Sequence, residues 1–228
     1  MISCIIPFHN EKDRIHRVLK VITQIVSLDE IICVDDGSTD GGRKIIQENF
    51  PKCICISSEG QCGKSHAVQL GLHTSHGDTL FLLDADLKNL KADELSHAIK
   101  YFENNPTLDM LLLPDLHPNI ETRLSRHDII FSGKRVLKRR DLLCIFSKYS
   151  PKRYQLEIAI NQYMMDENKN VEYLRISSND TVKSEKIGLI RGTFKNISML
   201  SSIVLFRGFF GYISQVVMFG HDEVRLSS

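Results

Sequence analysis

Short apolar runs alternate along this chain with longer segments whose apolar residues recur at helical spacing. The runs lie at residues 2–7, 31–34, 53–56, 79–83 and 110–113. Continuous apolar runs of this length are typical of strands that are buried on both faces. Because parallel strands need helical connections that cover both faces of the sheet, the alternation predicts an α/β domain with a mostly parallel central sheet flanked by helices.

The size and composition of the chain suit one globular domain with a substantial core. It has 228 residues and a formal net charge of +1, so no global charge points to nucleic acid. Its six cysteines include no CxxC pair, which argues against a structural zinc site and for a reducing, cytoplasmic chain. We find no signal-peptide pattern and no uncharged apolar stretch long enough to span a membrane.

The C-terminal part of the chain differs from the rest. Residues 188–220 are rich in apolar and aromatic residues and are interrupted by Arg191, Lys195 and Arg207. We therefore divide the chain into a first domain, residues 1–186, and an apolar, basic C-terminal helical region, residues 187–228. This composition fits a helix in a membrane interface, on the cytoplasmic face. It equally fits a helix pair packed on the domain or in a homodimer, and the sequence leaves both open.

A polar turn follows each of the first four predicted strands. These turns lie at residues 7–11, 35–40, 59–64 and 84–86. The carboxyl ends of parallel strands meet at one edge of a sheet, where open α/β sheets bind ligands. The sequence therefore predicts one binding site made from four separate turns.

Two carboxylates, those of Asp84 and Asp86, end the fourth apolar run. Carboxylate oxygens suit Mg²⁺ or Mn²⁺, and such ions are commonly shared with the phosphates of a substrate. Two like charges this close raise each other's pKa unless a cation lies between them. The pair predicts a metal–diphosphate site, with a solvated strand end as the alternative.

The third turn runs into Gly63-Lys64-Ser65, which is similar to the end of a P-loop. The full P-loop pattern requires a glycine five positions before Gly63, where this chain has Ser58. Lys64 can still bind phosphate as a point charge near a helix start. The second turn, 35–40, is either a helix-capping turn or a site where a carboxylate accepts hydrogen bonds from a base or ribose.

Taken together, these segments resemble the family 2 glycosyltransferases with the GT-A fold. The resemblance is specific over about residues 2–90, where four motifs occur in order: IIPFHNE at 5–11, VDDGSTD at 34–40, GKSHAVQLGL at 63–72 and GDTLFLLDAD at 77–86. The third motif is similar to the polyprenyl-phosphate sugar synthases. Further on, FSGKRVLKR at 131–139 resembles those synthases and the glucosyl-phosphoglycerate synthases.

The resemblance implies a nucleotide-sugar site in these turns. Asp36 would contact the base with Asp35 supporting the turn, and Lys64 would lie near the base or the diphosphate. Asp84 and Asp86 would face the ribose and a Mg²⁺ or Mn²⁺ ion, with Asp86 the more direct ligand. The other residues that would line the donor site are Pro7, Asn10, Glu11 and Ala85.

The second half of the chain resembles these enzymes more loosely. Segments 137–146 and 154–166 have helical patterns, and 171–176 has a strand pattern. The resemblance implies that Arg135 binds phosphate and that Glu157 accepts a proton from the acceptor or positions an acceptor-binding arginine. Inverting relatives often carry Glu-Asp where this chain has Glu157-Ile158, and His221 is its only late histidine.

The implied activity is a metal-dependent hexosyltransferase that uses a UDP- or GDP-linked sugar. Its acceptor would be a lipid phosphate, a cell-envelope glycan or a small phosphorylated molecule. Two other classes remain open from the sequence, a P-loop-like nucleotide hydrolase and a non-catalytic nucleotide-sugar-binding domain.

Overall fold

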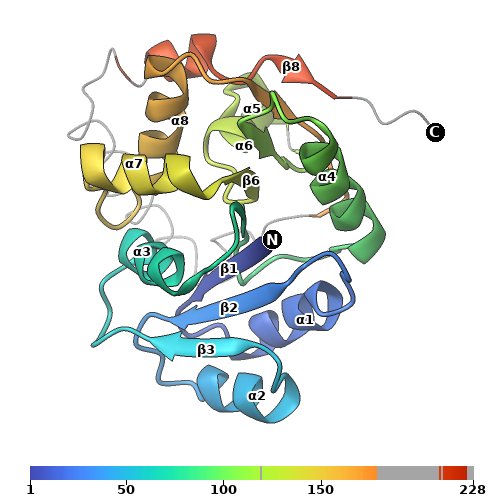
Figure 1. Cartoon of the computed structure of the whole chain (residues 1–228), viewed down its shortest axis with the longest axis vertical. Coiled ribbons are helices and arrows are strands. Elements are labelled where there is room, and N and C mark those ends of the chain that lie inside the picture. Colours follow the sequence, from blue (N-terminus) through green and yellow to red (C-terminus); the bar gives the residue numbers. More distant parts are fainter. Residues whose placement is uncertain (119, 179–210, 212, 225–228) are drawn as a thin grey trace.

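An eight-stranded sheet forms the centre of the molecule (Figure 1). The computed structural model describes residues 1–118, 120–178, 211 and 213–224. The strands, in the spatial order β3-β2-β1-β4-β6-β5-β7-β8, are β3 (Ile54–Ser57), β2 (Glu30–Asp35), β1 (Ile2–Phe8), β4 (Thr79–Leu82), β6 (Arg135–Lys138), β5 (Met110–Leu112), β7 (Val171–Tyr173) and β8 (Asp222–Glu223). All neighbours pair in parallel except β6, which runs antiparallel to β4 and β5. The predicted α/β fold with a mostly parallel sheet is confirmed.

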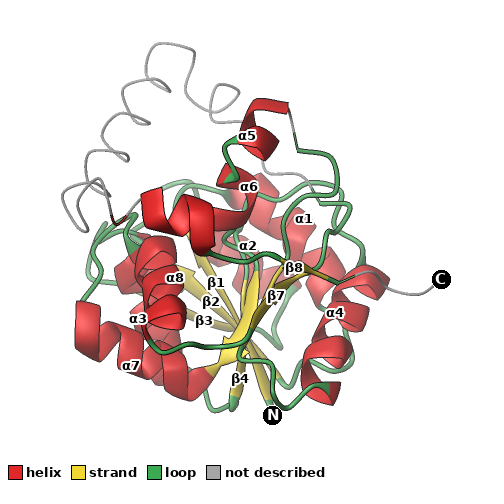
Figure 2. Cartoon of the chain, turned by 90° about the horizontal axis from the view of Figure 1, so that it is seen from above, coloured by secondary structure: helices red, strands yellow, loops and turns green. Residues whose placement is uncertain are grey.

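Helices cover both faces of this sheet (Figure 2). They are α1 (Lys12–Ile22), α2 (Gly42–Asn49), α3 (Lys64–Thr74), α4 (Ala92–Asn104), α5 (Ile120–Leu124), α6 (His127–Ile130), α7 (Arg139–Tyr149) and α8 (Leu156–Asp166). Successive strand residues point to opposite faces. Cys4 and Ile6 pack in a core with α1, α2 and α4, whereas Ile5 packs in a second core with α3, α7 and α8.

Helix α3 lies unusually close to the sheet. A Cβ atom at Gly71 would lie 2.5 Å from Cγ2 of Ile5 in β1, so the glycine is needed for this approach. The first turn of α3 is thereby held beside the carboxyl ends of the central strands. That placement brings Lys64 to the edge where the polar turns lie.

The segment after the β5 region differs from its predicted structure. We expected a helix from residue 137, but residues 137 and 138 belong to β6, and α7 begins at Arg139. Leu137 pairs with Leu80 of β4 and with Met110 of β5. A short apolar run has no period of its own that separates strand from helix, and the gap between β4 and β5 decides the outcome.

Part of the C-terminal region packs on the domain. Residues 213–218 are helical, Phe219 is 2% exposed in the second core, and β8 pairs with β7. Arg126, at the start of α6, donates hydrogen bonds to the carbonyl oxygens of Val216, Phe219 and Gly220. The predicted boundary at residues 186 and 187, with most of the apolar, basic region, lies outside the described residues.

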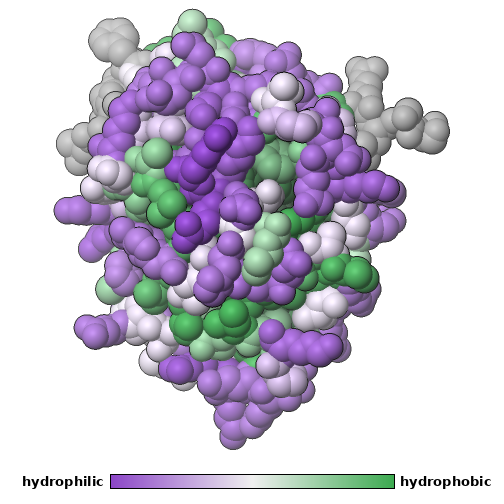
Figure 3. Space-filling view, in the orientation of Figure 1, coloured by the Kyte–Doolittle hydropathy of each residue, from purple (hydrophilic) through white to green (hydrophobic). Residues whose placement is uncertain are grey.

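The surface in the view of Figure 3 is mostly hydrophilic, with hydrophobic residues in small patches. Among the described residues, no helix has both the length and the hydropathy that crossing a bilayer requires.

Candidate active site

The first two turns of the predicted site are joined by hydrogen bonds. Asn10 donates its backbone N–H to Ser38 Oγ at 3.0 Å, and its side-chain oxygen accepts the N–H of Thr39 at 2.8 Å. The N–H of Lys12 reaches Asp40 Oδ2 at 2.8 Å. Asn10 has a φ of 53°, a left-handed conformation that asparagine tolerates better than most residues. Turns 7–11 and 35–40 therefore form one surface, in which Glu11 precedes α1 and pairs with Arg14 at 2.6 Å.

The second turn is also joined to the third. Asp35 closes its own turn, because its Oδ1 accepts the N–H of Ser38 at 2.8 Å. The carboxylate of Asp36 accepts the N–H groups of Cys62 and Gly63, each at 2.8 Å. Both aspartates are 5% exposed. The Asp36 contacts hold the loop that precedes α3 against the end of β2.

Lys64 connects the third turn to the fourth and to α8. Its ammonium group lies 2.5 Å from Asp84 Oδ1 and 2.7 Å from Glu157 Oε1. Burial alone would lower the pKa of Lys64, but the two carboxylates outweigh it, and the pKa lies above its ordinary value. Lys64 is therefore a fixed positive charge between two acids. The four turns thus meet at one edge, linked from one to the next.

A glycine makes room for this ion cluster. Gly133, in the loop before β6, is buried beside the ion pair. A Cβ atom there would lie 2.0 Å from Asp84 Oδ2 and 2.7 Å from Lys64 Nζ. The motif FSGKRVLKR at 131–139 contains Gly133 but implied no role for it. The available signal was a glycine directly before the basic pair Lys134-Arg135, but its closeness to Asp84 arises only from the fold.

The guanidinium group of Arg135 is buried and hydrogen-bonded within the protein. The side chain is 1% exposed and donates to the carbonyl oxygens of Ser132 and Ile130, at 2.7 and 2.9 Å, and to Asn161 Oδ1 at 2.6 Å. Burial lowers the pKa of Arg135 to about 10, although the negative charge of Glu157 opposes the shift. The phosphate-binding role that the sequence implied for Arg135 stays a prediction. Arg135 ties the loop containing residue 133 to α8. No sequence motif pointed to Asn161.

Asp84 and Asp86 form a donor set that fits a divalent cation. Both are half-buried in the turn after β4, with the buried Ala85 between them. Their oxygens are hard ligands of the kind that Mg²⁺ and Mn²⁺ prefer. The ammonium group of Lys64 already places positive charge against Asp84 Oδ1. A metal ion at this position would share Asp84 with the ammonium group of Lys64.

A small cavity lies beside this cluster. Residues that line it include Pro7 at the end of β1, Lys64, Gly133, Arg135 and Glu157. Glu157 is 8% exposed at the first turn of α8. The cavity thus brings together the β1 end, α3, the loop before β6 and α8, which come from both halves of the chain.

Comparison with known families fits this site. The sequence model of the family described as glycosyl transferase family 2 matches residues 3–179, which contain β2 to β7 and all of β1 except Ile2. The chain belongs to glycosyl transferase family 2. This membership confirms the resemblance seen in the four sequence motifs. The alternative of a P-loop hydrolase is wrong, because the family match covers the glycine–lysine segment on which that alternative depended.

Curated relatives match half of this family 2 chain or less. An undecaprenyl-phosphate 4-deoxy-4-formamido-L-arabinose transferase from Aeromonas hydrophila is 31% identical over 97 residues, which are 39% of this chain and 30% of the relative. An uncharacterized glycosyltransferase from Haemophilus influenzae is 30% identical over 117 residues, which are 50% of this chain and 38% of the relative. The chain thus matches only about a third of the length of these relatives.

Solved structures share the fold over most of the chain. Glucosyl-3-phosphoglycerate synthase from Mycobacterium tuberculosis, in complex with phosphoglyceric acid, has a TM-score of 0.72 and 17% identity, covering 90% of this chain and 79% of that one. The same synthase with Mn²⁺, UDP-glucose and phosphoglyceric acid has a TM-score of 0.70. At this identity the likeness shows the fold alone, and it confirms the GT-A architecture.

Proposed function

We propose that this family 2 glycosyltransferase transfers a hexose from a UDP- or GDP-linked sugar to a phosphorylated acceptor. The observation that carries the proposal is the linked set of four turns, which ends at Asp84 and Asp86 beside Lys64 and Glu157. This set offers carboxylates for a cation and a fixed ammonium group for a diphosphate. Both can neutralise the negative charge that develops when a sugar leaves a nucleoside diphosphate.

The donor nucleotide would occupy the first two turns. Pro7, Asn10 and Glu11 would line the nucleoside pocket, and Asp36 would contact the base through the loop edge that it already organises. Asp35 would keep the turn closed. Hydrogen bonds from fixed backbone groups reduce the reorganisation needed when a ligand binds.

Asp84 and Asp86 would hold Mg²⁺ or Mn²⁺, with Ala85 against the donor. When bound, such an ion supplies Lewis-acid stabilisation of a diphosphate leaving group. The chain's own part is to orient the donor and add positive charge where negative charge develops. Lys64 would supply that charge, held in place by Glu157. Solved complexes of the mycobacterial synthase with Mn²⁺ and UDP-glucose support this choice of ion and donor class.

The acceptor would carry a phosphate group. The names of the relatives include undecaprenyl phosphate, and those of the structural neighbours include phosphoglycerate. A phosphate is already ionised at neutral pH and needs no strong base. With a phosphate acceptor, the role of Glu157 would be to position Lys64, and that of Arg135 to hold the loop before β6. A glycan hydroxyl would instead require Glu157 to accept a proton.

One experiment tests the donor site. The protein is titrated calorimetrically with nucleotide diphosphates and their sugars, with Mn²⁺ or with chelator, and products are then sought with the best donor. Asp86→Ala should abolish Mn²⁺-dependent binding and lower turnover by about two to three orders of magnitude. Asp93→Ala, which removes an exposed acid from the first turn of α4, is the matched control.

The results separate the alternatives. Transfer that is near wild type in Asp86→Ala would refute the metal assignment. Tight donor binding with no product on lipid-phosphate, glycan or small phosphorylated acceptors would favour a non-catalytic nucleotide-sugar-binding domain. A kcat that falls with Glu157→Gln on a glycan, but hardly on a phosphate, would identify the acceptor class.

We also propose that the protein works in the cytoplasm, at the cytoplasmic face of a membrane. Apolar side chains are exposed on α5 and on residues 213–218: Ile120 (79%), Leu124 (80%), Val217 (62%) and Met218 (67%). Flotation with anionic vesicles tests this, and protein that stays with the unbound fraction would refute it. Sedimentation of the same preparation then tests the alternative use of this surface in a homodimer.

A further inference from the structure

Three different metal-ligand types meet beside the second turn, residues 35–40. Asp36 follows β2, Cys62 lies in the loop before α3, and His66 lies in the first turn of α3. One ligand atom from each, a carboxylate oxygen, the Sγ and an imidazole nitrogen, lie within 4.8 Å of one another. None of the three adjoins another in sequence, so the β2–α3 packing creates the group.

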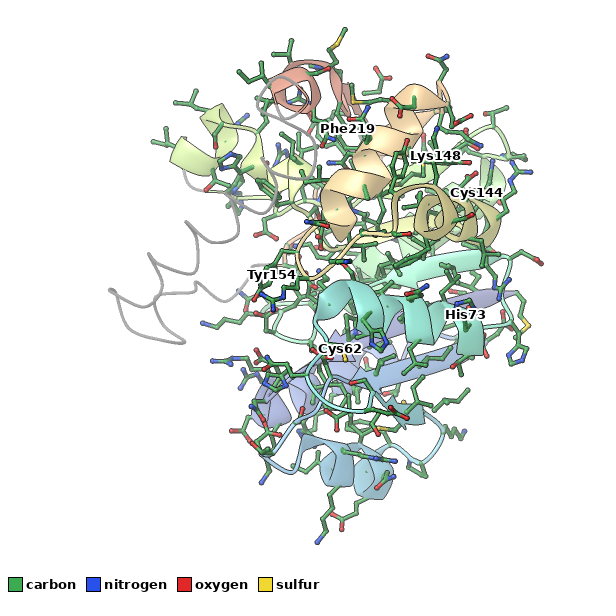
Figure 4. All side chains as sticks on the ribbon, turned by 90° about the vertical axis from the view of Figure 1, so that its left-hand side faces the viewer. Cys62, His73, Cys144, Lys148, Tyr154 and Phe219 are labelled. Carbon is green, nitrogen blue, oxygen red and sulfur yellow. The ribbon has the colours of Figure 1, made fainter. Side chains whose placement is uncertain are left out.

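The group is built on a fixed carboxylate with two accessible partners. Asp36 is 5% exposed, and its oxygens are oriented by the N–H groups of Cys62 and Gly63. The Cys62 thiol is free and exposed, and His66 is exposed as well. Figure 4 shows Cys62 at one end of α3 and His73 at the other. The site is therefore open to solvent, and only exposed side chains need to move.

The distances suit a small cation with modest adjustment. Zinc binds cysteine, histidine and carboxylate ligands at about 2.0–2.3 Å, which puts tetrahedral ligand atoms roughly 3.5 Å apart. Ligand atoms within 4.8 Å approach that spacing when the Cys62 and His66 side chains rotate toward Asp36. Thiolate and imidazole ligands select zinc-like ions over Mg²⁺ and Mn²⁺, which prefer oxygen.

We propose that Asp36, Cys62 and His66 bind a thiophilic divalent cation of the zinc class, with water as the fourth ligand. Cys62 binds as the thiolate, so its thiol proton is released to solvent. The site is made by residues other than Asp84 and Asp86. It also differs from a cysteine-rich structural site, whose absence the cysteine spacing predicted.

The cation would regulate donor binding. A cation on Asp36 occupies the carboxylate that the proposed function assigns to the base, so cation and nucleotide exclude one another. This consequence depends on the proposed function, whereas the site itself does not. Zinc-class ions would then inhibit the enzyme while Mn²⁺ activates it, through two different sets of side chains.

Cobalt titration of the reduced, metal-free full chain tests the site directly. Co²⁺ bound by a thiolate gives an intense near-ultraviolet charge-transfer absorption, which Zn²⁺ should remove by displacement. Cys62→Ser should abolish that absorption, and His66→Gln should weaken binding about tenfold or more. Cys144→Ser and His73→Gln remove another exposed cysteine and another exposed histidine, and should bind as the wild type does.

All four substituted side chains are exposed, so the variants should fold as the wild type does. Circular dichroism checks that they are folded. A wild-type chain with no thiolate absorption under excess Co²⁺, or one whose absorption survives in Cys62→Ser, would overturn the site. The second measurement is the affinity for the best nucleotide diphosphate, with and without Zn²⁺. Zinc should weaken it in the wild type but not in Cys62→Ser, and equal affinities would overturn the regulation while leaving the site intact.

Discussion

Replacing Gly133 by alanine should separate activity from stability. The added Cβ would lie 2.0 Å from Asp84 Oδ2 and 2.7 Å from Lys64 Nζ. Ordinary contact begins at 3.4 Å, so the carboxylate oxygen must move by 1.4 Å (3.4 − 2.0). Both obstructing groups are ends of side chains rather than backbone, so the chain can still fold. The collision therefore displaces the ion cluster and leaves the core intact.

The sizes of the two effects follow from this displacement. Moving Asp84 off its rotamer costs roughly 0.5–1.5 kcal/mol, and weakening its bond to Lys64 adds about 1 kcal/mol. Misplacing a catalytic group by about 1 Å lowers the rate about 100-fold, which equals about 2.7 kcal/mol. Gly133→Ala should therefore lose about 2 kcal/mol of stability but about two orders of magnitude in kcat/KM.

Urea unfolding and initial rates of sugar transfer measure the two quantities. Gly41→Ala is the matched control, because Gly41 has a φ of 82° and nothing within 4 Å of an added Cβ. Backbone strain alone should cost that variant about 1–2 kcal/mol of stability without lowering the rate. The two variants should thus lose similar stability and differ about 100-fold in activity.

One result would refute the reasoning about Gly133. If Gly133→Ala kept kcat/KM close to that of the wild type and bound Mn²⁺ with unchanged affinity, the Asp84 carboxylate would not need its observed position. The linked turns would then serve binding alone.

Three further perturbations test other contacts. In the presence of chelator, Lys64→Met should lose about 2 kcal/mol of stability, which lies between the contributions of exposed and of buried ion pairs. Mn²⁺ should restore part of that stability, because the ion replaces the lost positive charge beside Asp84. An equal loss with and without Mn²⁺ in urea unfolding would speak against a cation there. Arg126→Met should lose about 2 kcal/mol and expose the chain end to proteases, because three carbonyl oxygens lose their donor; unchanged proteolysis would contradict this. Burial alone would raise the pKa of Asp109, but hydrogen bonds led by that from Lys138 outweigh it and hold the pKa below its ordinary value. That stabilisation is present at neutral pH and is lost as pH falls below about 4, so Asp109→Asn should be less stable at neutral pH and lose less stability on acidification; parallel stability curves for variant and wild type would contradict it.

The sequence predicted the first half of the fold well because each strand there is continuous, apolar and followed by a polar turn. Strands that form only because they pair with strands from elsewhere in the chain were harder to predict. β6 lies antiparallel between β4 and β5, and its residues 137 and 138 were predicted as helix. β8 has two residues and depends on pairing with β7. Neither strand has a local pattern strong enough to identify it.

The candidate site also has a part that the sequence predicted and a part that only the fold shows. The motifs identified the four turns, the family and the acids at the end of β4. They did not identify how the turns connect: Lys64 bridges Asp84 and Glu157, and Arg135 bonds to carbonyl oxygens and to Asn161. Those contacts join residues far apart in the chain, so no local sequence pattern indicates them.

The amino-acid sequence by itself determined which residues form buried strands, where the chain turns, and which acids stand at the edge of the sheet. Those properties depend on residue type and spacing, which act locally. Tertiary packing alone decided the closeness of Gly133 to Asp84 and the grouping of Asp36, Cys62 and His66. Such distances depend on how helices and strands from distant parts of the chain pack together, and packing is a property of the whole fold.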